Sequence, residues 1–130
     1  MPALSITVLR GTFAVCRLDP GSGVPSWALA GSDFLSITRV VDELSIVALE
    51  SVVPGTVRAE RGWRCFRLEG PFPFELTGIL TSVADPLRDA GIGIFAISTF
   101  DTDYVLVKAG DLDRAITALE SAGHTVRGAQ

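Results

Sequence analysis

Polar side chains crowd into one short stretch of an otherwise apolar part of the chain. The segment ISTFDTDYVLV (97–107) places Thr99, Asp101, Thr102 and Asp103 between two apolar runs. Short polar side chains bond their own backbone where a chain reverses, so a hairpin turn is one interpretation. A carboxylate there can also accept hydrogen bonds from an ammonium group, which makes a pocket for a positively charged ligand the second. A hard-cation site is the third and weakest, because two carboxylates and two hydroxyls supply too few oxygens.

The residues around this stretch predict the elements that must position it. RCFRL alternates like a strand, and the segment from Thr77 to Gly91 has apolar residues at helical spacing, with Thr77 as a candidate N-cap and Gly91 as the stop. In chain order, the predicted elements are strand 64–68, helix 77–91, strand 92–98, strand 103–108, helix 111–123 and strand 124–127. This order, βαββαβ, is typical of a ferredoxin-like module.

The N-terminal half repeats part of this pattern at an offset of sixty residues. Ile37 falls on Ile97, Glu43 on Asp103, and the strand-like SITVL on the strand 64–68. FLSITRV and ELSIVAL also predict strands, but prolines and glycines leave only short helical turns, one of them near Trp27 and one before Pro54-Gly55. We therefore expect an α+β fold of two tandem ferredoxin-like (βαββαβ) modules with antiparallel sheets. A degenerate module would occupy 1–60 and a complete one 61–130.

Composition and charge exclude several classes of function. The chain is 48% hydrophobic and 20% charged, as in ordinary globular proteins, and its net charge is −4 with scattered arginines, so nucleic-acid binding is not expected. A signal peptide is not predicted, and no apolar segment is long enough to span a membrane, which favours a cytoplasmic protein. No catalytic relay, metal site or cofactor motif is recognisable, so we expect no enzyme and no cofactor.

Three residues with reactive side chains are interpreted as structural. Cys16 and Cys65 lie in apolar, strand-like segments without the spacing of a redox or metal pair, which predicts buried free thiols. His124 follows the helix-ending Gly123 and has no triad partner nearby in the sequence, which predicts a surface residue at the start of a strand.

Two segments carry a resemblance to a known family. TGILTSVADPLRDAGIGIFAIS resembles the helix–strand core of ACT domains, and ISTFDTDYVLV is similar to a signature of small two-module ACT proteins and their arginine-sensing relatives. The similarity is clear from about residue 63 to residue 125. It implies an amino-acid-binding regulatory module, usually paired with a second module and often dimeric.

The resemblance also implies a set of ligand-binding residues on two segments. They are Phe74, Glu75, Thr77, Gly78 and Ile79 before and at the start of the helix, and Ser98, Thr99, Phe100 and Asp103 at the hairpin. Gly78 would let backbone N–H groups approach an α-carboxylate, and Asp103 would accept hydrogen bonds from the α-ammonium. Leu76 stands where the arginine sensors carry an acidic residue, and only the neighbouring Glu75 could take that role.

Two functions from different classes follow from these features. The first is a sensor that binds a free amino acid at an ACT module interface and signals through assembly or through a protein partner that the sequence does not name. The second is a non-catalytic dimerisation or interaction module whose pocket is vestigial. Ligand-induced stabilisation discriminates between them. A homodimer is expected in either case, because the N-terminal module is weak and the apolar strands need cover.

Overall fold

The computed structural model describes residues 2–128, which divide into two compact units. The smaller unit is Gly11–Trp63, and the larger unit combines residues 2–10 with residues 64–128. The chain is an α+β protein, as predicted. The division of the chain into one module at 1–60 and another at 61–130 stays a prediction. The compact units are bounded differently, because they group the first strand with the C-terminal half.

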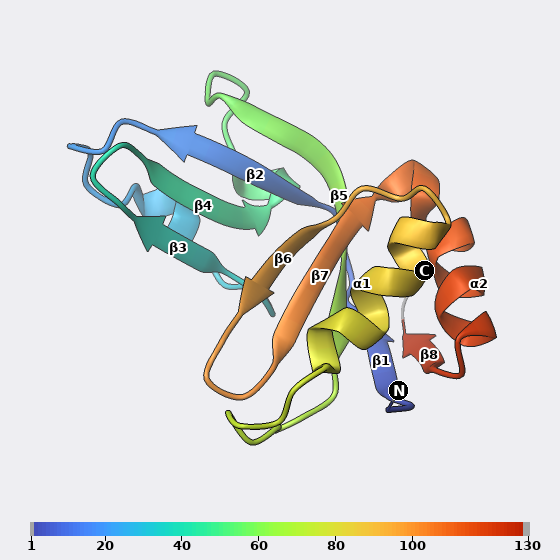
Figure 1. Cartoon of the computed structure of the whole chain (residues 1–130). Coiled ribbons are helices and arrows are strands. Elements are labelled where there is room, and N and C mark those ends of the chain that lie inside the picture. The colour runs from blue at the N-terminus through green and yellow to red at the C-terminus, as the bar shows by residue number, and fades with distance from the viewer. Residues whose placement is uncertain (1, 129–130) are drawn as a thin grey trace. The chain divides into compact units, whose positions relative to one another are not determined.

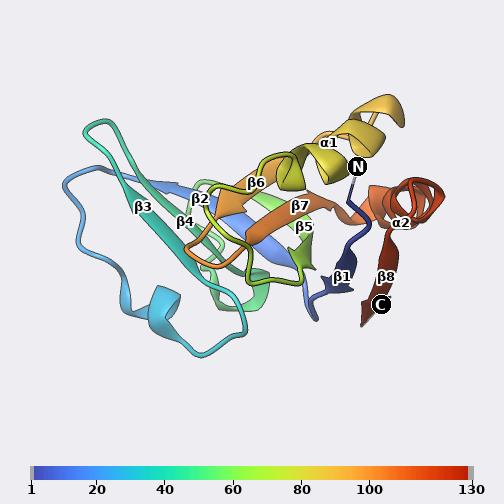
Figure 2. The same ribbon diagram turned by 60° about the horizontal axis from the view of Figure 1, so that its bottom comes forward.

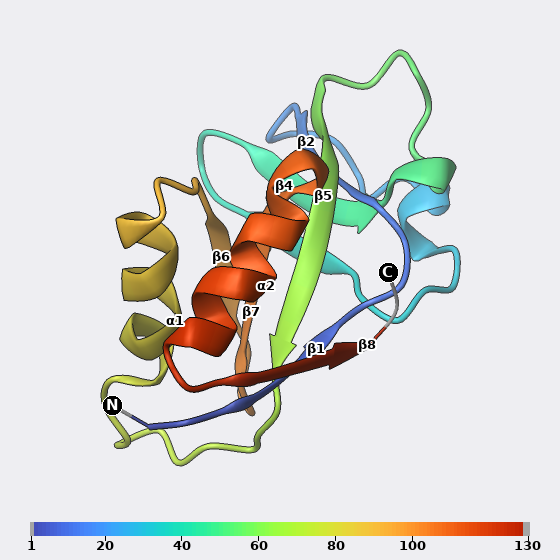
Figure 3. The same cartoon turned by 90° about the vertical axis from the view of Figure 1, so that its right-hand side faces the viewer.

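The larger unit consists of a sheet with two helices on one of its faces (Figures 1 and 3). Its elements are β1 (Ser5–Val8), the C-terminal part of β5 (Ala59–Leu68), α1 (Ile79–Asp89), β6 (Phe95–Ser98), β7 (Asp103–Lys108), the 3-10 turn η3 (Ala109–Asp111), α2 (Leu112–Ser121) and β8 (Thr125–Gly128). The strands lie in the order β8-β1-β5-β7-β6. From β5 onward the chain follows the predicted βαββαβ order, so the periodicity of the C-terminal half identified its elements correctly.

The core of the larger unit lies between the sheet and the two helices. Val83 and Leu87 of α1, Leu119 of α2 and Val105 and Val107 of β7 are fully buried in one hydrophobic cluster. Side chains alternate between the two faces of a strand. Asp103, the first residue of β7, lies two positions before Val105 and therefore faces the same helix-covered side.

The N-terminal strand completes this sheet. Ile6 lies opposite Leu68 and Val8 opposite Phe66 in the antiparallel pair of β1 and β5. On its other side β1 runs parallel to β8, as Figure 2 also shows, so the prediction of purely antiparallel sheets is wrong for this pair. SITVL and the strand 64–68, which the repeat matched with each other, are neighbouring strands of one sheet and share its apolar alternation.

A buried histidine connects α1 to the N-terminal segment. His124 is only 5% exposed, so its prediction as a surface residue is wrong. The backbone N–H of Leu4 donates to its Nδ1 at 3.0 Å, which leaves the proton on Nε2, and Nε2 donates to the Ser82 carbonyl at 2.7 Å. Residue 86 is a proline within α1 and has no N–H to offer that carbonyl. His124 therefore supplies the hydrogen bond that Pro86 cannot make.

The smaller unit is a sheet with two short 3-10 turns in place of helices. Its elements are β2 (Phe13–Leu18), η1 (Ser26–Leu29), β3 (Ser36–Arg39), β4 (Leu44–Leu49), η2 (Glu50–Val52) and the N-terminal part of β5, and its strands lie in the antiparallel order β3-β4-β2-β5. The short helical turns were predicted from the prolines and glycines. β2 is not among the predicted elements, although the sequence around Cys16 is strand-like.

The hairpins of the two units show the true register of the repeat. The N–H of Val40 donates to the carbonyl of Glu43, and the N–H of Thr99 donates to the carbonyl of Thr102. These equivalent turns lie fifty-nine residues apart, so the offset of sixty, which matched Ile37 with Ile97, was wrong by one residue. The difference matters because a shift of one residue moves a side chain to the opposite face of a strand.

Candidate functional site

The turn between β6 and β7 is held by its own two threonines. The N–H of Thr99 donates to the carbonyl of Thr102 at 2.8 Å, and the Thr99 hydroxyl donates to the same carbonyl at 3.1 Å. The Thr102 hydroxyl is buried and donates to the Leu68 carbonyl at the end of β5, at 2.6 Å. The turn interpretation of the polar stretch is therefore confirmed for the threonines, and the turn is tied to a central strand.

The segment that leads into α1 packs on this turn (Figures 1 and 2). The N–H of Phe72 donates to the carbonyl of Asp101 at 2.9 Å. A Cβ on Gly70 would lie 2.9 Å from the Asp101 carbonyl oxygen and 3.1 Å from the Phe72 nitrogen, so only glycine permits this close approach. The two segments that the resemblance singled out are thus brought together by backbone contacts.

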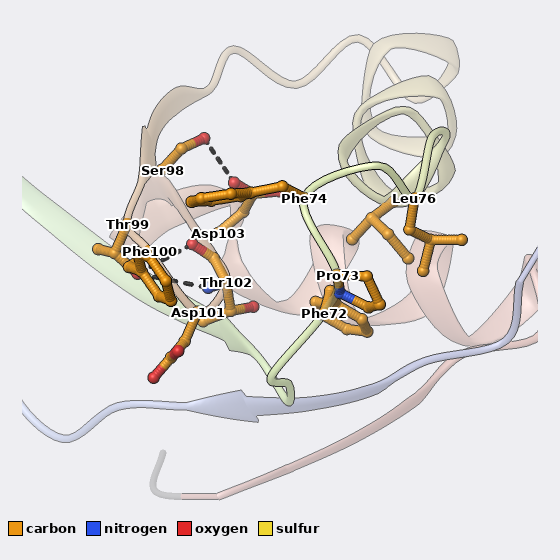
Figure 4. A pocket seen from close by; sticks show the side chains of 11 residues that line it. Phe72, Pro73, Phe74, Leu76, Ser98, Thr99, Phe100, Asp101, Thr102 and Asp103 are labelled. Carbon is orange, nitrogen blue, oxygen red and sulfur yellow. Dashed lines mark hydrogen bonds between the residues drawn. The ribbon is translucent and has the colours of Figure 1, made fainter.

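Asp103 lies at the mouth of this arrangement with Ser98 as its partner across the strands. The two residues are paired in the β6–β7 register, and the Ser98 hydroxyl donates to one carboxylate oxygen of Asp103 (Figure 4). A carboxylate offers about four acceptor sites on its two oxygens, so this bond leaves capacity for further donors. Asp103 can therefore accept hydrogen bonds from a ligand while Ser98 holds its orientation.

An exposed pair of aromatic rings faces the same space. Phe74 and Phe100 meet edge to face, with ring centroids 4.8 Å apart and an angle of 66° between the ring planes. The side chains are 74% and 78% exposed, which is unusual for rings that also contact each other. Phe74 comes from the segment before α1 and Phe100 from the turn, so the pair connects the two walls (Figure 4).

The two segments form the walls of an open cavity of about 210 Å³ within the larger unit. It is lined by Phe72, Pro73, Phe74, Leu76, Ile79, Ser98, Thr99, Phe100, Asp101, Thr102 and Asp103. Six of the nine residues implied by the resemblance are among them: Phe74, Ile79, Ser98, Thr99, Phe100 and Asp103. The lining shows where these residues lie, and their role in binding stays a prediction.

The other three implied residues, Glu75, Thr77 and Gly78, are not part of the lining. Gly78, not Thr77, occupies the N-cap position of α1, with φ at 85°, so the prediction of Thr77 as the cap is wrong. A positive φ is available to glycine at little cost, which explains why the chain enters the helix at this residue. No side chain caps this end of α1, so its first backbone N–H groups keep no intrahelical or side-chain acceptor.

Sequence reasoning left out several lining residues. Phe72 and Pro73 belong to the turn-rich GPFPFE segment, and the excess of aromatic residues in a predicted turn was the only signal for them. Leu76 had been noted only as a departure from the arginine sensors. Asp101, a member of the polar stretch, also lines the cavity. It is exposed, and in Figure 4 its carboxylate points away from Phe74.

The charges around the cavity are all negative. The carboxylates of Asp101 and Asp103 line it, and no lysine or arginine does. Among residues 2–128 no group of three or more His, Cys, Asp or Glu side chains could hold a metal ion. The geometry therefore suits a small molecule that carries an ammonium group and an apolar portion.

The thiols do not contribute to the site. Cys16 and Cys65 are buried and free, as predicted. Burial raises the pKa of Cys65 to about 12, and burial also raises the pKa of Cys16, although Arg61 acts in the opposite direction. Because the thiolate is the reactive form, neither side chain is poised as a nucleophile. No helix in the described range, 2–128, is long and apolar enough to cross a membrane.

Family comparison covers both units. A model of the ACT domain matches residues 58–121, which run from β5 to α2 and include every residue that lines the cavity. Residues 58–121 belong to the ACT-domain family. A second model, built for the N-terminal domain of a group of related proteins, matches residues 11–56.

Solved structures and curated proteins also resemble this chain. A crystal structure of a protein from Agobacterium tumefaciens is 44% identical, with a TM-score of 0.93, and the match covers 100% of this ACT protein and 96% of that chain. The ligand-free regulatory subunit of aspartate kinase from Thermus thermophilus shares the fold, with a TM-score of 0.64 at 10% identity over 93% of this chain and 99% of that one.

One curated relative is the cytosolic arginine sensor for mTORC1 subunit 1 from Pongo abelii. It is 27% identical over 128 residues, which cover 92% of this chain and 39% of the sensor. The chain thus spans well under half the length of that relative.

Proposed function

We propose that this ACT protein is a regulatory sensor that binds a free amino acid in the cavity between the β6–β7 turn and the segment before α1. The observation that carries the proposal is the position of Asp103, which is held by Ser98 at the mouth of a small cavity without basic side chains. Carboxylates are strong acceptors for an ammonium group. The regulatory relatives support the same function.

The start of α1 supplies a second contact for the same ligand. Ile79, its first residue, lines the cavity, and no side chain caps the helix there. Backbone N–H groups at a helix N-terminus attract anions, so an α-carboxylate would be oriented towards them. The ammonium would then be held at the turn and the carboxylate towards the helix. The protein acts in the cytoplasm in this proposal, as the cytosolic relative does.

A thermal-shift panel of the twenty amino acids tests the proposal. A ligand at about one hundred times its dissociation constant adds about 2.7 kcal/mol if it binds only the folded state. For a chain of this size the melting temperature should rise on the order of 5–10 °C. Asp103→Asn should abolish the shift, because it removes the negative charge while keeping the shape of the side chain.

Asp33→Asn is the matched control. Asp33 is an exposed aspartate of the smaller unit, so its substitution removes the same charge elsewhere and should leave the shift intact. The ligand-free melting temperature of either variant should stay within about 1–2 °C of the wild type, as is usual for exposed sites. An undiminished shift in Asp103→Asn would remove Asp103 from the site.

An interaction module remains the second candidate function, and exposed side chains of the smaller unit favour it. Its exposed large hydrophobic residues are Val24, Leu29, Leu35, Ile37, Val40 and Val41. Ile37 lies on β3, which forms an edge of the sheet in that unit, and exposed apolar edges invite pairing. A stable homodimer by light scattering, together with no thermal shift from any amino acid, would favour this function over the sensor.

A further inference from the structure

The cavity collects the exposed apolar surface of the larger unit. Within the described part of that unit, the exposed large hydrophobic side chains are Phe74, Leu76 and Phe100, and all three line the cavity. Exposed apolar residues scattered singly need no explanation, but residues gathered around one cavity mark a place where apolar surface becomes covered. These side chains therefore define an apolar wall that a ligand can bury.

The polar side chains of the cavity come from only one of its two walls, the turn, which also contributes Phe100 (Figure 4). The polar lining residues, Ser98, Thr99, Asp101, Thr102 and Asp103, all belong to the end of the β6–β7 hairpin. The segment before α1 contributes only apolar side chains to the lining, and Ile79 continues this side into the helix. Glu75 belongs to that segment, but it does not line the cavity. A ligand with an ammonium at the turn thus directs the rest of its length along an apolar wall.

This arrangement discriminates between side chains of the ligand. A basic side chain against the apolar wall would lose hydration without gaining a carboxylate partner, and burying an unpaired charge is costly. An acidic side chain would likewise find no lysine or arginine in the lining to pair with. The cavity has a volume of about 210 Å³ and is open to solvent, which suits a small ligand such as a single amino acid.

Resting on the function proposed above, we propose that the site is selective for amino acids with an uncharged, apolar side chain. Phe74, Leu76 and Phe100 bind the side chain, and Asp103 with Ser98 binds the ammonium. Leu76 sets this preference for apolar side chains. It is half exposed on the apolar wall, and the segment before α1 places no acidic side chain in the lining beside it.

Calorimetric titration of the wild type with leucine, phenylalanine, arginine and glutamate tests the selectivity. We expect leucine or phenylalanine to bind at least tenfold more tightly than arginine or glutamate. Arginine binding as tightly as leucine, or more tightly, would overturn the selectivity while leaving the proposed function intact. If no amino acid binds at all, the proposed function fails and the selectivity falls with it.

A substitution at Leu76 makes the test specific to the apolar wall. Leu76→Asp places a carboxylate on this wall, so leucine binding should weaken and arginine binding should strengthen, each by about tenfold or more. Leu29→Asp introduces the same change at an exposed leucine of the smaller unit and should leave both affinities unchanged. An unaltered ratio of leucine to arginine affinity in a folded Leu76→Asp protein would contradict the assignment.

Two analogues separate the ends of the ligand. 4-Methylpentanoic acid keeps the side chain and carboxylate of leucine but lacks the amino group, whereas 3-methylbutylamine keeps the side chain and amine but lacks the carboxylate. Because the charged side chains of the cavity are carboxylates, the acid should lose at least tenfold more affinity than the amine. The reverse order would overturn the placement of the ammonium at Asp103.

Discussion

The β3–β4 turn of the smaller unit and the β6–β7 turn of the larger unit are closed by the same backbone hydrogen bond but are braced in different ways. In the smaller unit, the N–H of Val40 donates to the carbonyl of Glu43 at 3.0 Å. The guanidinium of Arg17 donates to the carbonyl of Asp42 at 2.9 Å, and the guanidinium of Arg39 donates to carbonyls of the preceding loop. Long cationic side chains therefore connect this turn to its surroundings.

In the larger unit the equivalent brace is made by the backbone. The carbonyl of Asp101, at the position that Asp42 occupies in the other turn, accepts a hydrogen bond from the N–H of Phe72. Gly70 allows the two segments to approach this closely. The two hairpins share one geometry but differ in how the neighbouring segment is anchored to the turn. Arginine side chains connect it in the smaller unit, whereas a backbone hydrogen bond connects it beside the cavity of the larger unit.

The largest effect on stability is expected for His124, which binds α1. The larger unit has this complete helix, whereas the smaller unit has only 3-10 turns. His124→Ala should lower the free energy of unfolding by about 2–4 kcal/mol, because the N–H of Leu4 and the carbonyl of Ser82 would each lose a buried hydrogen bond. Denaturant titration followed by circular dichroism measures this loss. A cost below about 0.5 kcal/mol would mean that the bridge contributes only as much as an ordinary surface contact.

Pro86→Ala tests whether the proline is the reason for this bridge. The substitution returns an N–H to residue 86, within helical reach of the Ser82 carbonyl. In the Pro86→Ala background, His124→Ala should therefore cost at least about 1 kcal/mol less than it does in the wild type, the usual net value of one hydrogen bond. Strictly additive costs in the double-mutant cycle would contradict the coupling between Pro86 and His124.

A methyl group at the contact between Gly70 and Asp101 should disrupt the backbone brace that distinguishes the larger unit from the smaller one. Gly70→Ala should destabilise the protein by about 1–3 kcal/mol, as is typical when an atom is forced into a packed site, and should abolish amino-acid binding by displacing the loop from Asp101. Gly21→Ala is the matched control from the loop after β2, since a Cβ there meets nothing within 4 Å. Unchanged binding in a Gly70→Ala protein would show that the cavity does not depend on this contact.

The smallest effect is expected in the smaller unit. Arg39→Ala should lower the free energy of unfolding by about 0.5–1 kcal/mol, because its hydrogen bonds to the Pro20 and Ser22 carbonyls are exposed. Amino-acid binding should be unchanged in a calorimetric titration, the same measurement that detects the loss of binding in Gly70→Ala. Loss of binding in Arg39→Ala would contradict the assignment of the site to the larger unit.

Local sequence patterns predicted the elements that line the site. Helical spacing of apolar residues identified α1 and α2, and alternation identified the strands of the C-terminal half, because both patterns depend on neighbours within a few residues. The resemblance to ACT domains placed Ser98, Thr99, Phe100 and Asp103 on one segment. Prolines and glycines in the N-terminal half predicted the 3-10 turns. Each of these features is fixed by short-range sterics and hydrogen bonding.

Long-range contacts decided the rest. The same apolar alternation describes strands that pair and strands that repeat, so the sequence could not show that β1 lies beside β5 or that the hairpins are fifty-nine residues apart. His124 is buried because Pro86 leaves a carbonyl without a partner 42 residues earlier in the chain, at Ser82. Gly70 matters only because Asp101 lies against it. The sequence by itself determined which segments become strands, helices and turns; the tertiary structure decided which of their polar groups meet, because that depends on packing between residues far apart in the chain.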